Sequence, residues 1–447
     1  MRKLLTFIFI ISLLGSCRGP EGLQTNNLSY LYNDQEMALR PHLRFEYQSD
    51  TSCIVHYRLE TTSFLFTRLA DENLYEAKVV LNYQLLPQME VQEILDSGRV
   101  KFIHRVEEVG NKVLTGSFSL SLPLRETDES ELTLFTKIQD LNRGSEQSNF
   151  HVLKRNSLNN ENYFSFTDTA GNVLYKDHLP VHVPFRLYHK VLNPRYFYVS
   201  YYQRKFPLAL PPYSSKESQY FDIDPDTTFR VPADTNLALN REGFYHFRID
   251  TSQWEGFTLY SYYDHFPMVG NHKDMAGPLR YLTTQKEYDE LQSLKNQAEK
   301  LRNWIDDFWI RKGGNVQRAK DLVRVFYQRV ESANRFFSSY HEGWKTDRGI
   351  LYIIYGPPNK VYRSSAGEAW VYGNETSGLS YFFNFIRLDN PFSDNDFELD
   401  RSPQYRYGWG QAIEAWRRGH IYNSKDIRRE QDDYDQLQYR SRTPMWY

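Results

Sequence analysis

The spacing of apolar residues changes about two thirds of the way along the chain, and this change most constrains the fold. Up to about residue 270, apolar and polar residues alternate in short runs such as 53–59 and 132–138. A period of two is typical of half-buried antiparallel strands. From residue 284 onward, apolar residues recur at helical spacing instead, as they do in 301–309. The sequence therefore predicts a mainly β protein with a C-terminal α+β module.

The alternating runs fall into two blocks, which the polar stretch KRNSLNNENY separates. We expect each block to fold as a β-sandwich of general immunoglobulin-like shape, the first over residues 28–155 and the second over 156–275. Residues 276–390 should hold several helices followed by a small antiparallel sheet. The last segment, residues 391–447, is rich in Asp, Arg, Tyr and Gln. We expect it to form a tail that wraps the surface or becomes ordered on a partner.

The N-terminal residues predict export and lipid attachment. Arg2 and Lys3 precede an apolar run that is too short to span a bilayer and that ends in Leu-Gly-Ser-Cys. This arrangement resembles the signal peptide and lipobox of a bacterial lipoprotein. It implies that residues 1–16 are removed and that Cys17 carries several acyl chains, such as palmitate, which anchor the mature chain stably. Residues 17–27 hold little to bury, so we expect them to form a flexible tether.

The expected location is the outer membrane, with the protein anchored by lipid. No later stretch approaches the roughly 20 apolar residues that a membrane helix requires. Glu21 is the one acidic residue among the four that follow Cys17, whereas lipoproteins exported to the cell surface commonly carry several acidic residues there. We therefore favour the periplasmic face over the cell surface.

Charge and cysteine content narrow the range of partners and bonds. The chain has 54 Lys and Arg residues against 56 Asp and Glu residues, so no basic field suggests that it binds nucleic acid. Cys53 is the only cysteine besides Cys17, and it lies in an alternating run. We therefore expect Cys53 to be a buried strand residue, and we expect no disulfide within the mature chain.

The stretch HEGWKTDRGILYIIYGPPNKVYR, residues 341–363, is the densest cluster of chemically informative residues. We expect it to form the corner between a helix and a strand, with Gly343 at positive φ, Trp344 as a buried anchor and Asp347 bonded to turn amides. Two alternatives stay open: the cluster contacts a partner, or Asp347 serves as a general base. The residues that would form such a catalytic group are His341, Glu342, Thr346 and Asp347.

The motifs of this region together resemble the GWxTD domain. The pentapeptide Gly343-Trp344-Lys345-Thr346-Asp347 has the form that gives the domain its name, and it is followed by Arg348-Gly349, an apolar run and Tyr355-Gly356-Pro357-Pro358. The preceding RVFYQRVESANRFF and the following EAWVYG extend the resemblance over about residues 280–390. The resemblance implies a C-terminal module of an exported protein, often a lipoprotein, from a bacterium with two membranes. It implies no catalytic role.

The sequence gives little support for a metal site or a cofactor site. The alternating Asp residues of FDIDPDT are not followed by the Gly and Glu that a calcium loop requires, and Pro180 prevents His178 and His182 from sharing a helical face. The sequence contains no nucleophile elbow, phosphate loop or dinucleotide fingerprint. We therefore expect no metal and no cofactor, assign no catalytic residue, and favour a protein that is not an enzyme.

The C-terminal stretch YRYGWGQAIEAWRRGHIY is rich in Tyr, Trp and Arg, which are enriched at binding hot spots. Both contact with a partner and packing against the chain's own domain stay open for it. The residues that would contact a partner are Tyr405, Tyr407, Trp409, Trp416, Arg417 and Arg418.

These observations favour an outer-membrane lipoprotein that acts as a non-catalytic accessory or scaffold subunit of a cell-envelope assembly. Its expected partners are the membrane, through the lipid anchor, and one or more envelope proteins. The alternative is an envelope enzyme, or a protein that binds glycan or peptidoglycan, with a cleft near the motif between the second sandwich and the C-terminal module. Convergence of the four polar motif residues in an open cleft would favour that alternative.

Overall fold

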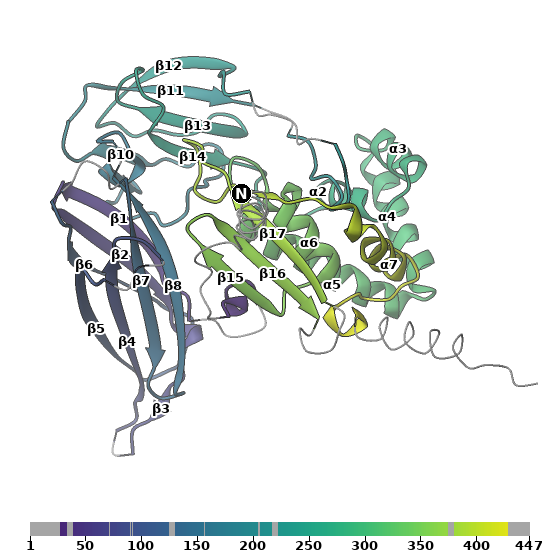
Figure 1. Ribbon diagram of the computed structural model, residues 1–447, viewed down its shortest axis with the longest axis horizontal. Coiled ribbons are helices and arrows are strands. Elements are labelled where there is room, and N and C mark those ends of the chain that lie inside the picture. The colour runs from purple at the N-terminus through teal and green to yellow at the C-terminus, as the bar shows by residue number, and fades with distance from the viewer. Residues whose placement is uncertain are drawn as a thin grey trace, which may run out of the picture.

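The computed structural model describes residues 27–33, 39–70, 72–89, 91, 93–124, 130–155, 157–203, 206–216, 222–373 and 380–427. The predicted signal peptide, Cys17 and all of the predicted tether except Asn27 lie outside the described residues. Figure 1 shows a large β-sandwich, a second β unit above one end of it, and a module of helices and a small sheet beside them. No helix within the described ranges is long and apolar enough to cross a bilayer.

The first unit is a sandwich of two antiparallel sheets. One sheet has the strand order β1-β2-β6, and the other has the order β3-β4-β7-β8 with β5 also paired to β4. The alternating residues 53–59 form a strand, as predicted, and their apolar side chains are buried between the sheets. Burial raises the pKa of the Cys53 thiol to about 12. The strands are β1 (His42–Ser49), β2 (Ser52–Glu60), β3 (Thr67–Arg68), β4 (Tyr75–Leu86), β5 (Asp96–Val106), β6 (Val113–Ser121), β7 (Glu131–Asp140) and β8 (Ser145–Lys154).

The second unit packs a two-stranded sheet against a four-stranded sheet of order β12-β11-β13-β14. Its core is strongly aromatic, with Phe164 and Phe166 of the small sheet packed against Phe257 of the large one. This unit is smaller than the first sandwich, since the described residues form six strands here and eight in the first unit. The strands are β9 (Phe164–Thr167), β10 (Arg186–His189), β11 (Tyr196–Tyr202), β12 (Thr227–Pro232), β13 (Gly243–Arg248) and β14 (Phe257–Ser261).

The C-terminal module begins with helices whose ends follow local signals. Thr284 and Glu287 form a capping box at the start of α3, and Gly314 ends α4 in the left-handed conformation. The side chain of Asn315 caps α5 by accepting a hydrogen bond from the Arg318 amide. The helices are α2 (His272–Ala276), α3 (Gln285–Ser293), α4 (Ala298–Gly313), α5 (Val316–Phe337), α6 (Asp347–Tyr355) and α7 (Arg406–Arg417).

A four-stranded antiparallel sheet completes the module, in the order β15-β16-β17-β18. β18 pairs with β17, and α7 buries Trp409 and Trp416 in the module's core. The domain boundary expected at residue 390 is therefore wrong: residues 397–417, expected to form a surface tail, belong to the module. The strands are β15 (Lys360–Ser364), β16 (Gly367–Gly373), β17 (Ser380–Arg387) and β18 (Phe397–Leu399).

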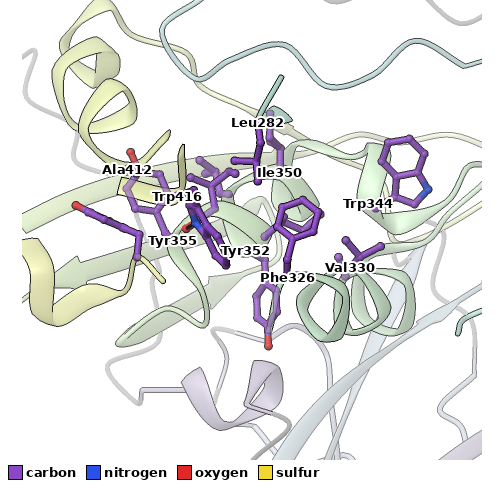
Figure 2. Packing of buried hydrophobic residues seen from close by; sticks show 14 of the residues in the cluster. Leu282, Phe326, Val330, Trp344, Ile350, Tyr352, Tyr355, Ala412 and Trp416 are labelled. Atoms are coloured by element: carbon purple, nitrogen blue, oxygen red, sulfur yellow. Dashed lines mark hydrogen bonds between the residues drawn. The ribbon is translucent and has the colours of Figure 1, made fainter. Parts of the chain in front are cut away.

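The apolar run after the pentapeptide is a helix, which corrects the expectation of a strand. All nine residues of α6, Asp347–Tyr355, are buried. A helix that is buried on every side has no polar face, so its sequence shows no helical period and looks like a buried strand. In Figure 2, Ile350 and Tyr352 of α6 lie close to Phe326 of α5 and to Trp416 of α7.

The predicted fold class is confirmed, since two sandwich-like β units precede a module of helices and a small sheet.

Candidate functional site

The two glycines of the motif allow close backbone contacts. A Cβ atom on Gly343 would lie 1.9 Å from the Ala333 carbonyl oxygen in α5, and one on Gly349 would lie 1.9 Å from the Gly343 oxygen. Gly343 does not have a positive φ angle, so the expectation of a left-handed helix stop is wrong. Glycine is needed here because the start of α6 lies directly against the end of α5.

Trp344 is the buried anchor that the sequence predicted, with 8% of its surface exposed. Its ring covers Gly277, where a Cβ atom would lie 2.9 Å from the indole. Tyr281 packs edge-on against the same ring at 6.2 Å, and the Tyr281 hydroxyl donates to the Trp344 carbonyl over 2.8 Å. The indole therefore fixes the motif to the segment between α2 and α3.

Thr346 and Asp347 hold the N-terminus of α6 through different contacts. Thr346 Oγ1 accepts a hydrogen bond from the Gly349 amide over 2.9 Å and donates to the Gly343 carbonyl over 2.8 Å. Asp347 reaches away from the turn instead: Oδ2 accepts from the Leu399 amide over 2.8 Å, and Oδ1 pairs with Arg401. Asp347 therefore ties α6 to β18 and the residues after it, and Thr346 provides the turn contact that the sequence assigned to Asp347.

Burial dominates the electrostatics of Asp347. Removal from water raises the pKa of the carboxyl to about 6, although Arg401 and the Leu399 amide favour the charged form. A carboxyl with such a pKa is suited to proton transfer near neutral pH, but this one is almost inaccessible to solvent.

The other polar residues of the motif do not join Asp347 in a catalytic group. The His341 ring packs against Phe206 and Tyr340, and burial lowers its pKa to about 3, so it is uncharged at neutral pH. Glu342 pairs with Lys345 over 2.5 Å. Among the described residues, no hydrogen bond joins His341 or Glu342 to Asp347. The convergence of the four residues that would favour a catalytic group is therefore not observed.

A glutamate that the sequence did not single out forms the most connected polar centre of the module. Glu368 of β16 accepts hydrogen bonds from the Tyr32 hydroxyl over 2.8 Å, from Arg363 Nη2 over 2.6 Å and from the Trp370 indole over 3.0 Å. Arg348, the residue after the pentapeptide, lies 3.4 Å from the same carboxylate. Burial alone would raise the pKa of Glu368, but Arg363 and Arg348 hold it at about 2. The sequence held one sign of this centre: Glu368 is the only acidic residue in the otherwise largely apolar stretch EAWVYG.

The N-terminal segment is part of this centre. Leu28 donates its amide proton to the Val361 carbonyl over 2.9 Å, and Asn27 Oδ1 accepts from the Val361 amide over 3.1 Å. Tyr352 of α6 donates its hydroxyl proton to the Tyr32 carbonyl over 2.8 Å. Residues 27–32 therefore pack at the edge of β15, and the expected start of the first sandwich at residue 28 is wrong. The same segment reaches the sandwich, since the Tyr30 hydroxyl bonds the Ser148 carbonyl in β8.

The C-terminal end of α6 is capped by side chains from two other helices. Arg329 of α5 donates to the carbonyls of Ile353 and Ile354 over 3.0 and 3.1 Å, and the Trp416 indole donates to Ile354 over 2.9 Å. Gly356 follows at a φ of 86°, and a Cβ atom there would lie 2.8 Å from the Arg329 guanidinium. Gly356, Pro357 and Pro358 therefore follow directly on the end of α6 and prevent it from continuing. Pro357 is exposed and Pro358 is buried.

Most of the candidate partner residues in the C-terminal stretch pack inside the module. Tyr405, Trp409 and Trp416 are buried, and Arg417 donates to the Leu282 carbonyl over 2.6 Å. Two of the six are accessible: Tyr407 is 68% exposed, and the Arg418 side chain is 77% exposed. Of the two interpretations that the sequence left open, packing on the chain's own domain accounts for the four buried or bonded residues.

Aromatic side chains fill the junction where the alternative function placed a cleft. Tyr202 and Phe244 of the second β unit stack at 4.3 Å, and Phe392 of the module packs edge-on against both. The Tyr260 hydroxyl bonds the Phe392 carbonyl across the same junction. Among the described residues, no group of three or more His, Cys, Asp or Glu side chains is placed to hold a metal ion.

Comparison with known families identifies part of the chain. Residues 243–418 match the family model of the GWxTD domain. The match starts at β13 and ends just after α7, so it is wider at both ends than the resemblance in the sequence suggested, and it includes the α7 residues that were expected in the tail. No curated protein was found to be similar to this chain.

Proposed function

Because the chain carries a GWxTD domain, we propose that it is a lipid-anchored outer-membrane protein that serves as a non-catalytic scaffold in a cell-envelope assembly. In this proposal, Cys17 carries the lipid, the protein faces the periplasm, and envelope proteins bind to its surfaces. The acyl chains supply the membrane attachment, since a chain with two or more of them binds a bilayer stably.

The observation that carries the proposal is the docking of residues 27–32 at the edge of β15. Nine residues separate Cys17 from Asn27, and an extended chain spans at most about 3.3–3.6 Å per residue. A lipid on Cys17 would therefore keep the GWxTD domain within about 35 Å of the membrane surface. The GWxTD domain would then lie near the bilayer although it comes last in the sequence, together with the part of the first sandwich that contacts the same segment.

The contacts between the units support a scaffold, because they fix the β units relative to the GWxTD domain. Arg387 of β17 forms two hydrogen bonds of 3.1 Å with Glu131 of β7. Arg44 of β1 pairs with Asp177 of the second unit over 2.5 Å. Units held in this way present their loops at fixed distances from the membrane anchor.

The alternative of an enzyme or glycan-binding protein with a cleft at the motif receives no specific support from the geometry. Trp344, Thr346 and Asp347 are buried and engaged in contacts within the domain. The proposal therefore assigns these motif residues to the folding of the domain and leaves binding to the surface.

Affinity purification from detergent-extracted membranes tests the proposal. We expect the full-length protein to partition with the membrane fraction and to retain a stoichiometric envelope protein. The Cys17→Ala variant is the matched control and should lose membrane attachment while keeping its fold. Recovery of the wild-type protein alone, with turnover of a peptide or glycan substrate, would contradict the scaffold. Cleavage by added protease on intact cells would contradict the periplasmic orientation.

A further inference from the structure

A hollow of about 350 Å³ lies on the outer face of the first sandwich, over β5, β4 and β7, which Figure 1 shows side by side. The opposite face of these strands carries Leu81, Leu85 and Leu134, which are buried against the other sheet. Side chains alternate between the two faces of a strand, so the residues between these leucines point away from the core. The side chains of that outer face that line the hollow are Asn82, Gln84, Ser97, Arg99, Phe135 and Lys137.

The pairing register arranges these six residues in two neighbouring rows across the strands. In the first row Asn82 of β4 is paired with Arg99 of β5 on one side and with Lys137 of β7 on the other. In the second row, Gln84 is paired with Ser97 and Phe135 in the same way. Cross-strand partners have Cβ atoms roughly 5 Å apart, so the rows form one continuous surface of amides, cations and one aromatic ring.

Hydrogen bonds and an ion pair, some of them to residues of the next row, orient the polar groups of the first row. Arg99 donates from Nε to Asn82 Oδ1 over 2.8 Å, and Lys137 pairs with Glu146 over 2.6 Å. Gln139, one step further along β7, donates to the same glutamate over 2.8 Å. Within the described residues, the Arg99 Nη groups and the Gln84 side-chain amide make no hydrogen bond to the protein. The hollow therefore offers oriented donors that a ligand can use.

The balance of charge around the hollow favours an anion. Arg99 and Lys137 line the hollow and Lys101 lies on the same face, with the carboxylate of Glu146 beside Lys137. Glu76 and Glu131 lie further along this face, where Glu76 pairs with Lys78 and Arg105, and Glu131 pairs with Arg387. Asp96 is close in sequence, but it accepts hydrogen bonds from the amides of Ser97 and Ser121 at the strand end. The surface thus keeps an excess of positive charge, although the chain as a whole is slightly acidic.

The aromatic ring and the amides point to a sugar. Phe135 is partly exposed, and it is held in place by Phe150 of β8 at 5.0 Å. A fixed ring gives the apolar face of a sugar a surface to stack on, and amide and guanidinium groups bond its hydroxyls. The volume lies at the small end of the range for ligand pockets, roughly 300–1,000 Å³, so it suits a short segment of a chain.

We propose that this hollow binds a segment of an acidic saccharide, with Phe135 stacked on a sugar ring, Gln84 and Asn82 bonded to hydroxyls, and Arg99 paired with a carboxylate. The proposal goes beyond the scaffold function, since it needs neither the lipid anchor nor a protein partner. It also differs from a glycan cleft at the GWxTD motif, because the hollow is lined by β4, β5 and β7 of the first sandwich and contains no residue of the motif.

Calorimetric titration of the full-length protein in detergent tests the proposal. The probe is an oligogalacturonate, whose sugars carry carboxylates, and a neutral malto-oligosaccharide of the same length is the comparison ligand. We expect binding of the acidic probe that weakens as salt is added, and at least tenfold weaker binding of the neutral one. Arg99→Gln should weaken binding of the acidic probe by about tenfold or more, because a hydrogen bond to a charged group contributes about 1.5–3 kcal/mol.

Arg324→Gln is the matched control, since Arg324 is an exposed arginine on α5 whose one ion pair among the described residues is with Asp321. It should leave binding unchanged, as should Cys17→Ala, which separates this test from that of the lipid anchor. Absence of binding by the wild-type protein, or an equal loss in Arg99→Gln and Arg324→Gln, would overturn the proposal. Equally tight binding of a single-stranded oligonucleotide through Arg99 would also overturn it, because the surface would then bind anions without regard to sugar.

Discussion

The first sandwich and the GWxTD domain each contain an ion pair, and the two pairs differ strongly in burial. In the sandwich, Lys137 and Glu146 pair at the surface, with 33% and 52% of their side chains exposed. In the GWxTD domain, Arg348 and Glu368 pair in the core, with 2% and 0% exposed. Surface pairs contribute about 0–1 kcal/mol to stability, whereas breaking a buried pair costs about 3–5 kcal/mol. The GWxTD domain therefore adds a buried ion pair to a large apolar core, and its stability should depend on that one polar contact more than the sandwich depends on its surface pair.

Glu368→Ala should break this comparison most strongly. The substitution leaves Arg348 and Arg363 buried without their carboxylate, so the free energy of unfolding should fall by about 3–5 kcal/mol. Chemical denaturation measures the loss. Glu146→Ala in the sandwich should change the same quantity by about 1 kcal/mol or less. Equal losses in the two variants would contradict the distinction between the regions, and Glu368→Gln, which keeps the shape of the side chain, should lose less than Glu368→Ala.

Trp344→Ala tests the apolar part of the same domain. Removal of a buried indole leaves a cavity, so we expect a loss of about 3–5 kcal/mol and a largely unfolded GWxTD domain, detected by thermal denaturation. Tyr407→Ala removes an exposed aromatic residue of α7 and should stay within about 0.5 kcal/mol of wild type. A folded Trp344→Ala protein that has lost only a partner would assign the tryptophan to binding.

The buried Asp347 should make the stability of the GWxTD domain depend on pH. The pKa of its carboxyl is raised in the folded state to about 6, so the folded protein binds a proton that the unfolded chain has already released. Stability from this group is therefore present below about pH 4 and is lost as the pH rises to about 6. The loss is on the order of 2–3 kcal/mol, since one pKa unit corresponds to about 1.4 kcal/mol.

The Asp347→Asn variant isolates this contribution. Denaturation at several pH values should show that the difference in unfolding free energy between the variant and the wild type changes between pH 4 and 6 and is constant above about pH 7. A difference that is constant over the whole range would show that Asp347 has the same pKa in the folded and unfolded states.

Of these variants, Tyr32→Phe should have the smallest effect on stability. It tests the N-terminal segment, which contacts both the first sandwich and the GWxTD domain. The variant keeps the ring between Phe337 and Trp370 and removes the hydroxyl that donates to Glu368 and accepts from Arg363, at a cost of about 1.5–2 kcal/mol. We expect faster proteolysis near residues 27–33, measured by limited digestion and mass spectrometry. Unchanged digestion together with unchanged stability would mean that the segment is held by Leu28 and the backbone pairing alone.

The sequence was informative where structure depends on neighbouring residues. Alternation located strands of the first sandwich, such as those at 53–59 and 132–138, and the buried position of Trp344 followed from its place in the motif. It failed for α6, because an apolar run that is buried on all sides looks the same in a helix and in a strand. It also failed for the Glu368 centre, since Tyr32, Arg348 and Glu368 come from three distant parts of the chain, and their meeting depends on the tertiary fold.

The docking of residues 27–32 on β15 also sets an order of events in biosynthesis. The partners of this segment, Tyr352, Val361 and Glu368, are made more than 300 residues later. A chain that emerges from its N-terminus can complete the first sandwich early, but its first segment has to wait for nearly the whole protein before it can pack. Until the segment docks, the face of the GWxTD domain that it covers stays exposed. A fragment that starts at His42 would leave that face exposed permanently.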